Sequence, residues 1–258
     1  MQKPHLERIR EQFTRTAEVY ARMQQATDER GLEALVAISG AVAEDRVLDV
    51  ACGPGFLTMA FAKHCAAATG FDATEAFLEL ARAEAKARGL SNISFEHGDA
   101  EALPFADASF DRVVCRAAFH HFSNPEGVLA EMARVARPGG KVVVADLVGN
   151  EDAEVAALHD AVERLCDPTH VRALPAAEFE RLAKGAGLTT ALHVPTTLDN
   201  DLAEWIAHGA PGDEARAEIV SRMESYVEDD RAGLNVRREG GTLRFTHQAS
   251  VFVLERAT

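Results

Sequence analysis

The sequence predicts an α/β fold built on a doubly wound, mostly parallel sheet that helices cover on both faces. Apolar segments of strand length alternate with segments of helical periodicity along much of the chain, which is typical of consecutive β-α-β units. One strand-like segment, "VLDVACGPG" at 47–55, ends in a glycine-rich turn, and such a turn usually holds the ligand of an open α/β sheet. The 258 residues, 47% of them hydrophobic, suffice for one large domain of this kind with additions.

Seven segments are expected to form the sheet. Five lie in the alternating part of the sequence, and their apolar character is that of parallel strands buried on both faces. They are 46–52, 66–72, 92–99, 110–118 and 141–148. Two more follow, "LTTALHVPT" at 188–196 and the long "TLRFTHQASVFVLER" at 242–256. We expect this last strand to be antiparallel.

The predicted helices carry start and stop signals. One begins with Thr74 as its N-cap and ends at Gly89. Another has Asn124 as its N-cap and Pro125 at the first helical position, and it stops before Pro138. Further helices are expected as follows: two within 5–43, one within 150–174 with a loop after it, one at 176–187, and two within 199–231.

No internal repeat or low-complexity linker divides the chain. We therefore expect a single domain over residues 1–258. Within it we expect an N-terminal helical cap at 1–45, a ligand-binding core at 46–148, and helical insertions with the last two strands at 149–258.

The charge of the chain bears on its partners. Lys and Arg number 27 against 41 Asp and Glu, a net charge of −14, which argues against nucleic acid and anionic membrane surfaces. No run of about 18 apolar residues predicts a membrane span, and the charged N-terminus is unlike a signal peptide. A cytoplasmic location is therefore expected. The four cysteines form no C-x-x-C pair, so we expect buried thiols and no zinc site.

Three nucleotide ligands compete for the glycine turn. A P-loop would need Ser or Thr after Gly140-Lys141, where Val142 stands. A dinucleotide fingerprint would need a third glycine, where Thr58 stands. Asp49 lies inside the strand, four positions before Gly53. Its carboxylate would oppose a pyrophosphate and favour an ammonium or sulfonium, which indicates a positively charged adenosyl ligand.

Further motifs follow the turn in order: "TGFDAT" at 69–74, "GDAEALPFADASFDRVVC" at 98–115 and "RAAFHHFSNPEGVLAEMARVARPGGKVVVAD" at 116–146. With them the sequence resembles the class I S-adenosylmethionine (AdoMet)-dependent methyltransferases, in the broad group that includes the ubiquinone and menaquinone C-methyltransferases. The resemblance covers 46–148 and departs at Ala51, where a first glycine is common. It implies a Rossmann-like methyltransferase fold, AdoMet as cofactor, and methyl transfer to a small-molecule acceptor.

Two aspartates at strand ends are the main cofactor candidates. Asp72 ends the second strand, 19 residues after Gly53, where a carboxylate can accept both ribose hydroxyls; a helix cap is the alternative. Asp99 ends the third strand and is placed to accept from the adenine amino group, with the amide of Ala100 donating to the ring. A turn aspartate is the alternative there.

The resemblance adds further cofactor residues. It implies that Ala51 and Gly53 line the amino-acid moiety, that Arg116 contributes carbonyl contacts, and that Tyr20 lies on a helix that covers the cofactor. A core tyrosine is the alternative for Tyr20. Ala73, next to Asp72, is also expected in the cofactor site.

Methyl transfer is an in-line displacement at an activated carbon, so alignment and exclusion of water supply much of the acceleration. Where a base is needed, histidine is the usual choice. His121, after the fourth strand, and His170, in "CDPTHVRALP" at 166–175, are the catalytic candidates; packing and an ordinary surface loop are the respective alternatives. Metal-dependent catechol methyltransferases carry carboxylates where this chain reads "RAAFHHF", so we expect a metal-independent reaction.

Two other functions stay open. A NAD(P)-dependent oxidoreductase would share the sheet, but the Tyr-x-x-x-Lys pair of short-chain dehydrogenases is missing, since Gln24 follows Tyr20 and Asp230 follows Tyr226 at that spacing. A non-catalytic AdoMet-binding protein also fits, because no obligatory catalytic group can be named. The acceptor, the choice among C-, N- and O-methylation, the use of a base and the oligomeric state are not predicted.

Overall fold

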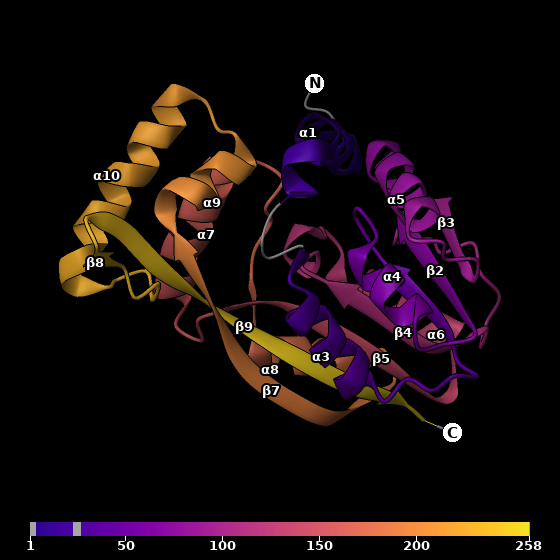
Figure 1. The fold of residues 1–258 in the computed structure, drawn as a ribbon. Helices are drawn as coiled ribbons and strands as arrows, with labels where there is room; N and C mark the ends of the chain where they lie inside the picture. The colour runs from indigo at the N-terminus through magenta and orange to yellow at the C-terminus, as the bar shows by residue number, and fades with distance from the viewer. Residues whose placement is uncertain (1–3, 23–26, 258) are drawn as a thin grey trace.

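A computed structural model describes residues 4–22 and 27–257. Its main sheet has the order β3-β2-β1-β4-β5-β9-β7, and Figure 1 shows this sheet with most of its strands labelled. The parallel strands are β1 (Arg46–Val50), β2 (Ala67–Asp72), β3 (Ile93–His97), β4 (Phe110–Arg116) and β5 (Ala136–Gly149). β9 (Thr242–Arg256) is antiparallel to both β5 and β7 (Leu188–Asp201). The predicted doubly wound sheet with an antiparallel last strand is confirmed.

Both faces of the sheet are buried. Alternate residues of each strand point to opposite sides, so each strand contributes to two apolar clusters. Leu48 of β1 and Val113 of β4 belong to one apolar cluster, while Val47 and Val114 belong to another. The first cluster is covered by α6 (Pro125–Val135) and α8 (Ala176–Gly185), and the second by α3 (Glu29–Ser39) and α4 (Phe56–Ala62). This two-sided burial explains the continuous apolar runs of the sequence.

Two more helices complete this half of the molecule. α5 (Glu75–Ala87) packs on β3 and β2. α1 (His5–Tyr20) packs on α5 and also on α9 (Leu202–Gly209), so it touches both ends of the molecule (Figure 1). A short 3₁₀ helix, η1 (Phe119–His121), follows β4.

A second group of elements gathers at one end of the molecule, on the left in Figure 1. We call it the C-terminal lobe: α7 (Ala153–Cys166), α9, α10 (Asp213–Asp229), β8 (Arg237–Glu239) and the adjoining ends of β7 and β9. It has its own apolar cluster, which includes Val162, Ile219 and Phe245. None of the described helices is long and apolar enough to cross a membrane.

Several boundaries differ from expectation. β5 begins five residues before Lys141, because Ala136 pairs with Phe110 ahead of an irregularity in the ladder. β7 continues to Asp201 because β9 pairs along its full length. The two-residue β6 (Leu174–Pro175) and the three-residue β8 were not predicted.

The two predicted caps also differ from each other. Asn124 caps α6 by accepting from the amide of Gly127. Thr74 stands before α5, but its side chain makes no capping bond. Its own amide donates to Asp72, a bond that fixes the chain just before the helix but caps none of the amides of its first turn.

Candidate functional site

A cavity lies at the carboxyl ends of β1 to β4, beneath α1. β1 sits there between β2 and β4, where the strand order reverses, and this is where ligands of open α/β sheets bind. The cavity holds about 1100 Å³ of empty space, part of it continuous with solvent. It is lined by the nine residues predicted for the cofactor and by His121: Tyr20, Asp49, Ala51, Gly53, Asp72, Ala73, Asp99, Ala100 and Arg116.

The glycine turn after β1 is held in the left-handed backbone region. Ala51, Gly53 and Gly55 have φ values of 55°, 54° and 76°. A Cβ atom on Gly55 would lie 2.7 Å from the ring of Phe95, whereas one on Gly53 would meet nothing within 4 Å. Glycine is therefore required at position 55 both by the packing of Phe95 and by the left-handed backbone conformation. At Ala51 the same conformation costs about 1–2 kcal/mol, and strain of this kind concentrates at functional sites.

Asp49 is almost fully buried, with 1% of its surface exposed. Its carboxylate accepts a hydrogen bond from the hydroxyl of Thr58 at 2.6 Å. Burial raises the pKa of Asp49 to about 7, against the opposing effects of Thr58 and Arg116. Thr58 does not line the cavity but holds a residue that does, and in the sequence it stands out only as the position of a missing glycine. A cation in the cavity would favour the ionised form of Asp49.

Asp72 is buried and fixed by backbone amides. Its Oδ2 atom accepts from Gly53 and its Oδ1 atom from Thr74, each at 2.8 Å. Burial raises its pKa, against these two hydrogen bonds. Because a carboxylate oxygen can accept more than one bond, the carboxylate retains acceptor capacity while its orientation is set.

Asp99 and Ala73 lie on neighbouring parts of the rim. Oδ1 of Asp99 accepts from the amide of Glu101 at 3.0 Å, so the turn role considered from sequence is present, and the residue also lines the cavity. The carbonyl of Ala73 accepts from Nε of Arg10 on α1 at 3.0 Å. No local pattern in the sequence pointed to Arg10, because its partner is 63 residues away.

α1 covers the cavity with aromatic side chains. Phe13 and Tyr20 both pack against Phe77 of α5, with ring centroids 5.7 Å and 5.4 Å away. Nε2 of His5 lies 2.7 Å from the carbonyl oxygen of His121. Burial raises the pKa of the Tyr20 hydroxyl. The helix therefore adds apolar surface and the neutral hydroxyl of Tyr20 to the cavity.

The two histidines predicted for catalysis lie in different places. His121 lines the cavity, packs edge-on against Phe13 at 5.2 Å and has Nδ1 3.2 Å from the hydroxyl of Thr169. Burial, together with the neighbouring His120, lowers its pKa to about 3, so it is neutral at ordinary pH and a weak base. His170 is buried outside the cavity lining, with Nε2 2.8 Å from Oδ1 of Asp160.

Asp146 organises the segment that follows β4. It accepts from the amides of Ala118 and Phe119 at 2.7 Å, and from Nδ1 of His120 at 2.5 Å. Burial lowers the pKa of His120, but the Asp146 carboxylate outweighs that effect and the pKa is raised. Asp146 does not line the cavity, so its described contacts position the chain that carries His121.

The arrangement combines three aspartates from neighbouring strand ends, a strained glycine turn and an aromatic cover. Carboxylates at the ends of three adjacent strands suit a ligand with several hydrogen-bond donors. The buried carboxylate of Asp49 favours positive charge nearby. The aromatic side chains of α1 and α5 suit the exclusion of water.

Comparisons with known proteins agree on one family. Residues 48–144 match the family model described as a methyltransferase domain. The uncharacterized methyltransferase YcgJ from Bacillus subtilis is 30% identical over 219 residues, which cover 85% of this chain and 87% of that protein. The ubiquinone/menaquinone biosynthesis C-methyltransferase UbiE from Bdellovibrio bacteriovorus is 41% identical over 149 residues, which cover 55% of this chain and 62% of that protein.

Solved structures agree with the sequence relatives. The crystal structure of YcgJ superposes with a TM-score of 0.82 at 27% identity and covers 89% of this chain and 99% of that one. A putative methyltransferase from Bacillus halodurans gives a TM-score of 0.83 at 27% identity, with coverage of 88% and 99%. The similarity therefore extends beyond the segment that the family model matches.

Proposed function

The chain belongs to the class I S-adenosylmethionine-dependent methyltransferases, and we propose that the cavity beneath α1 is where it holds AdoMet and methylates a small-molecule acceptor. The observation that carries this assignment is the convergence of Asp49, Asp72 and Asp99 on one cavity around the strained glycine turn. These residues come from three different strand ends that are adjacent in the sheet. AdoMet supplies an activated methyl group on a sulfonium.

Each carboxylate has a proposed role that follows from its surroundings. Asp72, oriented by the amides of Gly53 and Thr74, accepts from the ribose hydroxyls. Asp99, at the rim, accepts from the adenine amino group. Asp49, buried behind the turn, provides negative charge near the cationic end of the cofactor.

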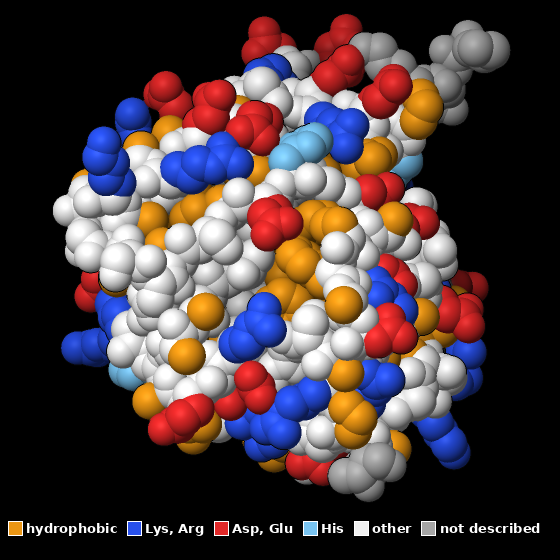
Figure 2. Space-filling model, turned by 90° about the vertical axis from the view of Figure 1, so that its right-hand side faces the viewer, with side chains coloured by type: hydrophobic (Ala, Val, Ile, Leu, Met, Phe, Trp, Pro, Cys, Tyr) orange, Lys and Arg blue, Asp and Glu red, His pale blue; other side chains and the backbone are white. Residues whose placement is uncertain are grey.

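The acceptor is proposed to lie between the cofactor and α1. Leu6, Ile9 and Phe13 of α1 line the cavity, which favours an acceptor with an apolar or aromatic part. Acidic and basic side chains are interspersed on the face shown in Figure 2, and the chain carries a net charge of −14. Both observations support a small molecule over a nucleic acid.

The residues of this chain contribute mainly by binding and alignment. α1 and α5 exclude water, and the glycine turn lets the backbone approach the ligand closely. His121 is proposed to contact the acceptor. Its pKa is lowered to about 3, so His121 is neutral at ordinary pH and in that form can accept a hydrogen bond. It is too weak a base to hold a proton at neutral pH.

The oxidoreductase alternative is not favoured. Thr58, at the position of the third fingerprint glycine, is used to hold Asp49. The buried carboxylate of Asp49, beside the glycine turn, opposes a pyrophosphate. The alternative of binding without turnover differs from the proposal in one observable, the formation of S-adenosylhomocysteine from AdoMet.

Calorimetric titration of the purified protein tests the proposal. S-adenosylhomocysteine should bind with a Kd of about 1 μM, corresponding to about −8 kcal/mol, while NADH and NADPH should not bind. Incubation with AdoMet and a panel of quinone precursors, amines and carboxylic acids should then release S-adenosylhomocysteine with at least one acceptor. Binding of a nicotinamide nucleotide in place of the thioether would overturn the assignment of the cavity.

A further inference from the structure

A second cluster of buried polar side chains lies in the C-terminal lobe, outside the cofactor cavity. It consists of His159 and Glu163 on α7 and His247 on β9. Their exposed fractions are 4%, 7% and 3%, and none of the three lines the cavity beneath α1. One nitrogen of each histidine and one carboxylate oxygen all lie within 4.8 Å of one another.

The spacing within the cluster is that of metal ligands. His159 and Glu163 are four residues apart on one helix, which places both side chains on the same face. Nε2 of His159 lies 3.4 Å from Oε1 of Glu163. Two ligands of a tetrahedral Zn²⁺ at about 2.0–2.1 Å from the ion are about 3.3 Å apart. This pair therefore already has the separation that a shared ion requires.

His159 also has an unsatisfied polar atom. Its Nε2 atom is buried and makes no hydrogen bond within the described part of the chain, although it faces Glu163. A buried polar atom without a partner is costly. An ion between the two side chains would satisfy it.

The third member, His247, is already bonded to Glu163. Its Nε2 atom lies 2.7 Å from Oε1 of Glu163. An ion would replace the proton of this hydrogen bond. The distance between the two atoms would then increase by about 0.6 Å, to the ligand spacing of a zinc site. The ladder between β9 and β7 places His247 opposite Leu198, so the ring approaches α7 from a paired strand.

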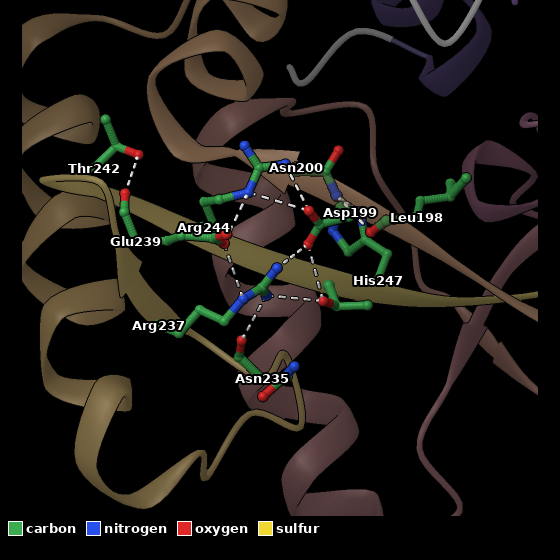
Figure 3. Close-up of polar contacts among 10 residues, drawn as sticks. Leu198, Asp199, Asn200, Asn235, Arg237, Glu239, Thr242, Arg244 and His247 are labelled. Atoms are coloured by element: carbon green, nitrogen blue, oxygen red, sulfur yellow. Dashed lines mark hydrogen bonds and ion pairs between the residues drawn. The ribbon is translucent and has the colours of Figure 1, made fainter.

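Outer contacts orient the His247 ring, as Figure 3 shows. Nδ2 of Asn200 lies 3.2 Å from Nδ1 of His247. Outer partners of this kind fix the ring of a metal-bound histidine, and rotation of the amide would turn its oxygen toward Nδ1–H in the ion-bound form. Phe245 and Trp205 pack around the same ring, with centroids 4.8 Å and 6.1 Å away.

We propose that His159, Glu163 and His247 bind one divalent transition-metal ion, with Zn²⁺ the preferred species, and that the ion ties α7 to β9. Two imidazoles and one carboxylate suit Zn²⁺, whereas Mg²⁺ and Ca²⁺ prefer oxygen ligands only. A water completes the tetrahedron. Because none of the three ligands lines the cavity beneath α1, the ion is placed to hold the lobe together and not to act in methyl transfer.

The position of α7 gives the site a link to the cavity wall. Asp160, on the same helix, bonds to His170 at 2.8 Å. The His170 ring packs 5.5 Å from that of His120. An ion that fixes α7 thus also supports the segment that follows β4. The cluster was missed in the sequence because Glu163 and His247 are 84 residues apart.

Metal uptake by the full-length protein tests the proposal. After equilibration with ZnCl₂ and removal of loosely bound metal, elemental analysis should find about one Zn²⁺ per chain. CoCl₂ in place of ZnCl₂ should give visible d–d absorption without a thiolate charge-transfer band, because no cysteine belongs to the cluster. Zinc X-ray absorption should show imidazole scattering and no sulfur ligand. This last measurement needs no variant.

Matched variants locate the ion. Glu163→Gln and His247→Gln should weaken Zn²⁺ binding by about 100-fold or more, since loss of an outer partner alone costs about 10–100-fold. Asn200→Ala should weaken it by about tenfold. His64→Gln is the control, because His64 also pairs with a glutamate, Glu33, at 2.8 Å, but on the surface. This control should bind Zn²⁺ like the wild type.

Three results would overturn the proposal. The first is uptake far below one equivalent by the wild type, which would mean that the cluster is a hydrogen-bonded histidine–glutamate group only. The second is sulfur scattering at the zinc edge. The third is unchanged Zn²⁺ binding in a folded Glu163→Gln protein, with folding checked by circular dichroism.

Discussion

The cofactor cavity and the C-terminal lobe treat their aspartates in opposite ways. In the lobe, Asp199 accepts from Arg237 and Arg244, as Figure 3 shows, and these two arginines lower its pKa to about 2. At the cavity, Asp49 accepts from the neutral hydroxyl of Thr58, and burial raises its pKa to about 7. The first carboxylate is neutralised within the protein. The second is held at a cost in free energy, which a cationic ligand would offset.

The contrast extends to the backbone. Ala51 in the glycine turn and Ala210 at the end of α9 both have positive φ values, 55° and 47°. The lobe uses this conformation to terminate a helix, whereas the turn uses it beside the cavity. Local strain alone therefore does not mark a site. A site is indicated where backbone strain lies beside carboxylates whose only hydrogen-bond donors are neutral groups.

The largest expected effect separates the two kinds of aspartate directly. Asp72→Ala should weaken S-adenosylhomocysteine binding by at least about 100-fold, because each hydrogen bond to a charged group contributes about 1.5–3 kcal/mol. Asp199→Ala removes the same side chain in the lobe and should leave the Kd unchanged. Calorimetry of the two variants measures the difference. Equal affinities would break the comparison.

A smaller effect concerns pH and Asp49. The pKa of Asp49 in the folded protein is raised from the ordinary value of 3.8 to about 7. Its contribution to the free energy of unfolding is therefore fully present below the unfolded pKa and is lost as pH rises through about 7. AdoMet, which is cationic at sulfur, prefers the ionised carboxyl. Between about pH 6 and 8 the ratio of AdoMet affinity to S-adenosylhomocysteine affinity should therefore rise by up to about tenfold.

Asp49→Asn is the control for this pH effect. The amide retains an oxygen that can accept from Thr58 but has no charge to titrate. The ratio of the two affinities should then be flat over the same pH range. A ratio that still rises in the variant would assign the titration to another group.

The smallest effect comes from relief of strain. Ala51→Gly and Ala210→Gly should each raise the free energy of unfolding by about 0.5–1 kcal/mol, because glycine adopts positive φ without the Cβ penalty. Loss of the Ala51 methyl group should also weaken S-adenosylhomocysteine binding by about threefold, while Ala210→Gly should not. Denaturant titration and calorimetry check the two parts. A destabilised Ala51→Gly protein would contradict the strain described for the turn.

What the sequence predicts well is local or repeated. The strands β1 to β5 follow from apolar runs, and the cavity follows from a glycine turn with acidic residues at strand ends. Contacts made by folding are not predicted in this way. His170 looks like a loop residue, yet it is buried against Asp160. The polar end of β7, "TLDND" at 197–201, becomes a strand only because β9 pairs with it.

The β7–β9 ladder has a consequence for motion. Its pairing runs from Leu188 opposite Arg256 to Asp201 opposite Arg244, with one irregularity near Thr190. At about 3.3 Å per residue, this two-stranded ribbon is about 45 Å long, and it belongs to both the sheet and the lobe. Rotation of the lobe about a hinge would have to bend a hydrogen-bonded ladder.

We therefore expect the cavity to open by movement of α1. Besides the aromatic packing of Phe13 and Tyr20 on Phe77, this helix is joined to the cavity rim only by a few side-chain contacts among the described residues, such as those from Arg10 to Ala73 and from His5 to His121. Breaking such contacts costs less than bending the ribbon. We expect the rate of product release to be set by detachment of α1, so that turnover is limited by a local opening and not by rigid-body movement of the two halves.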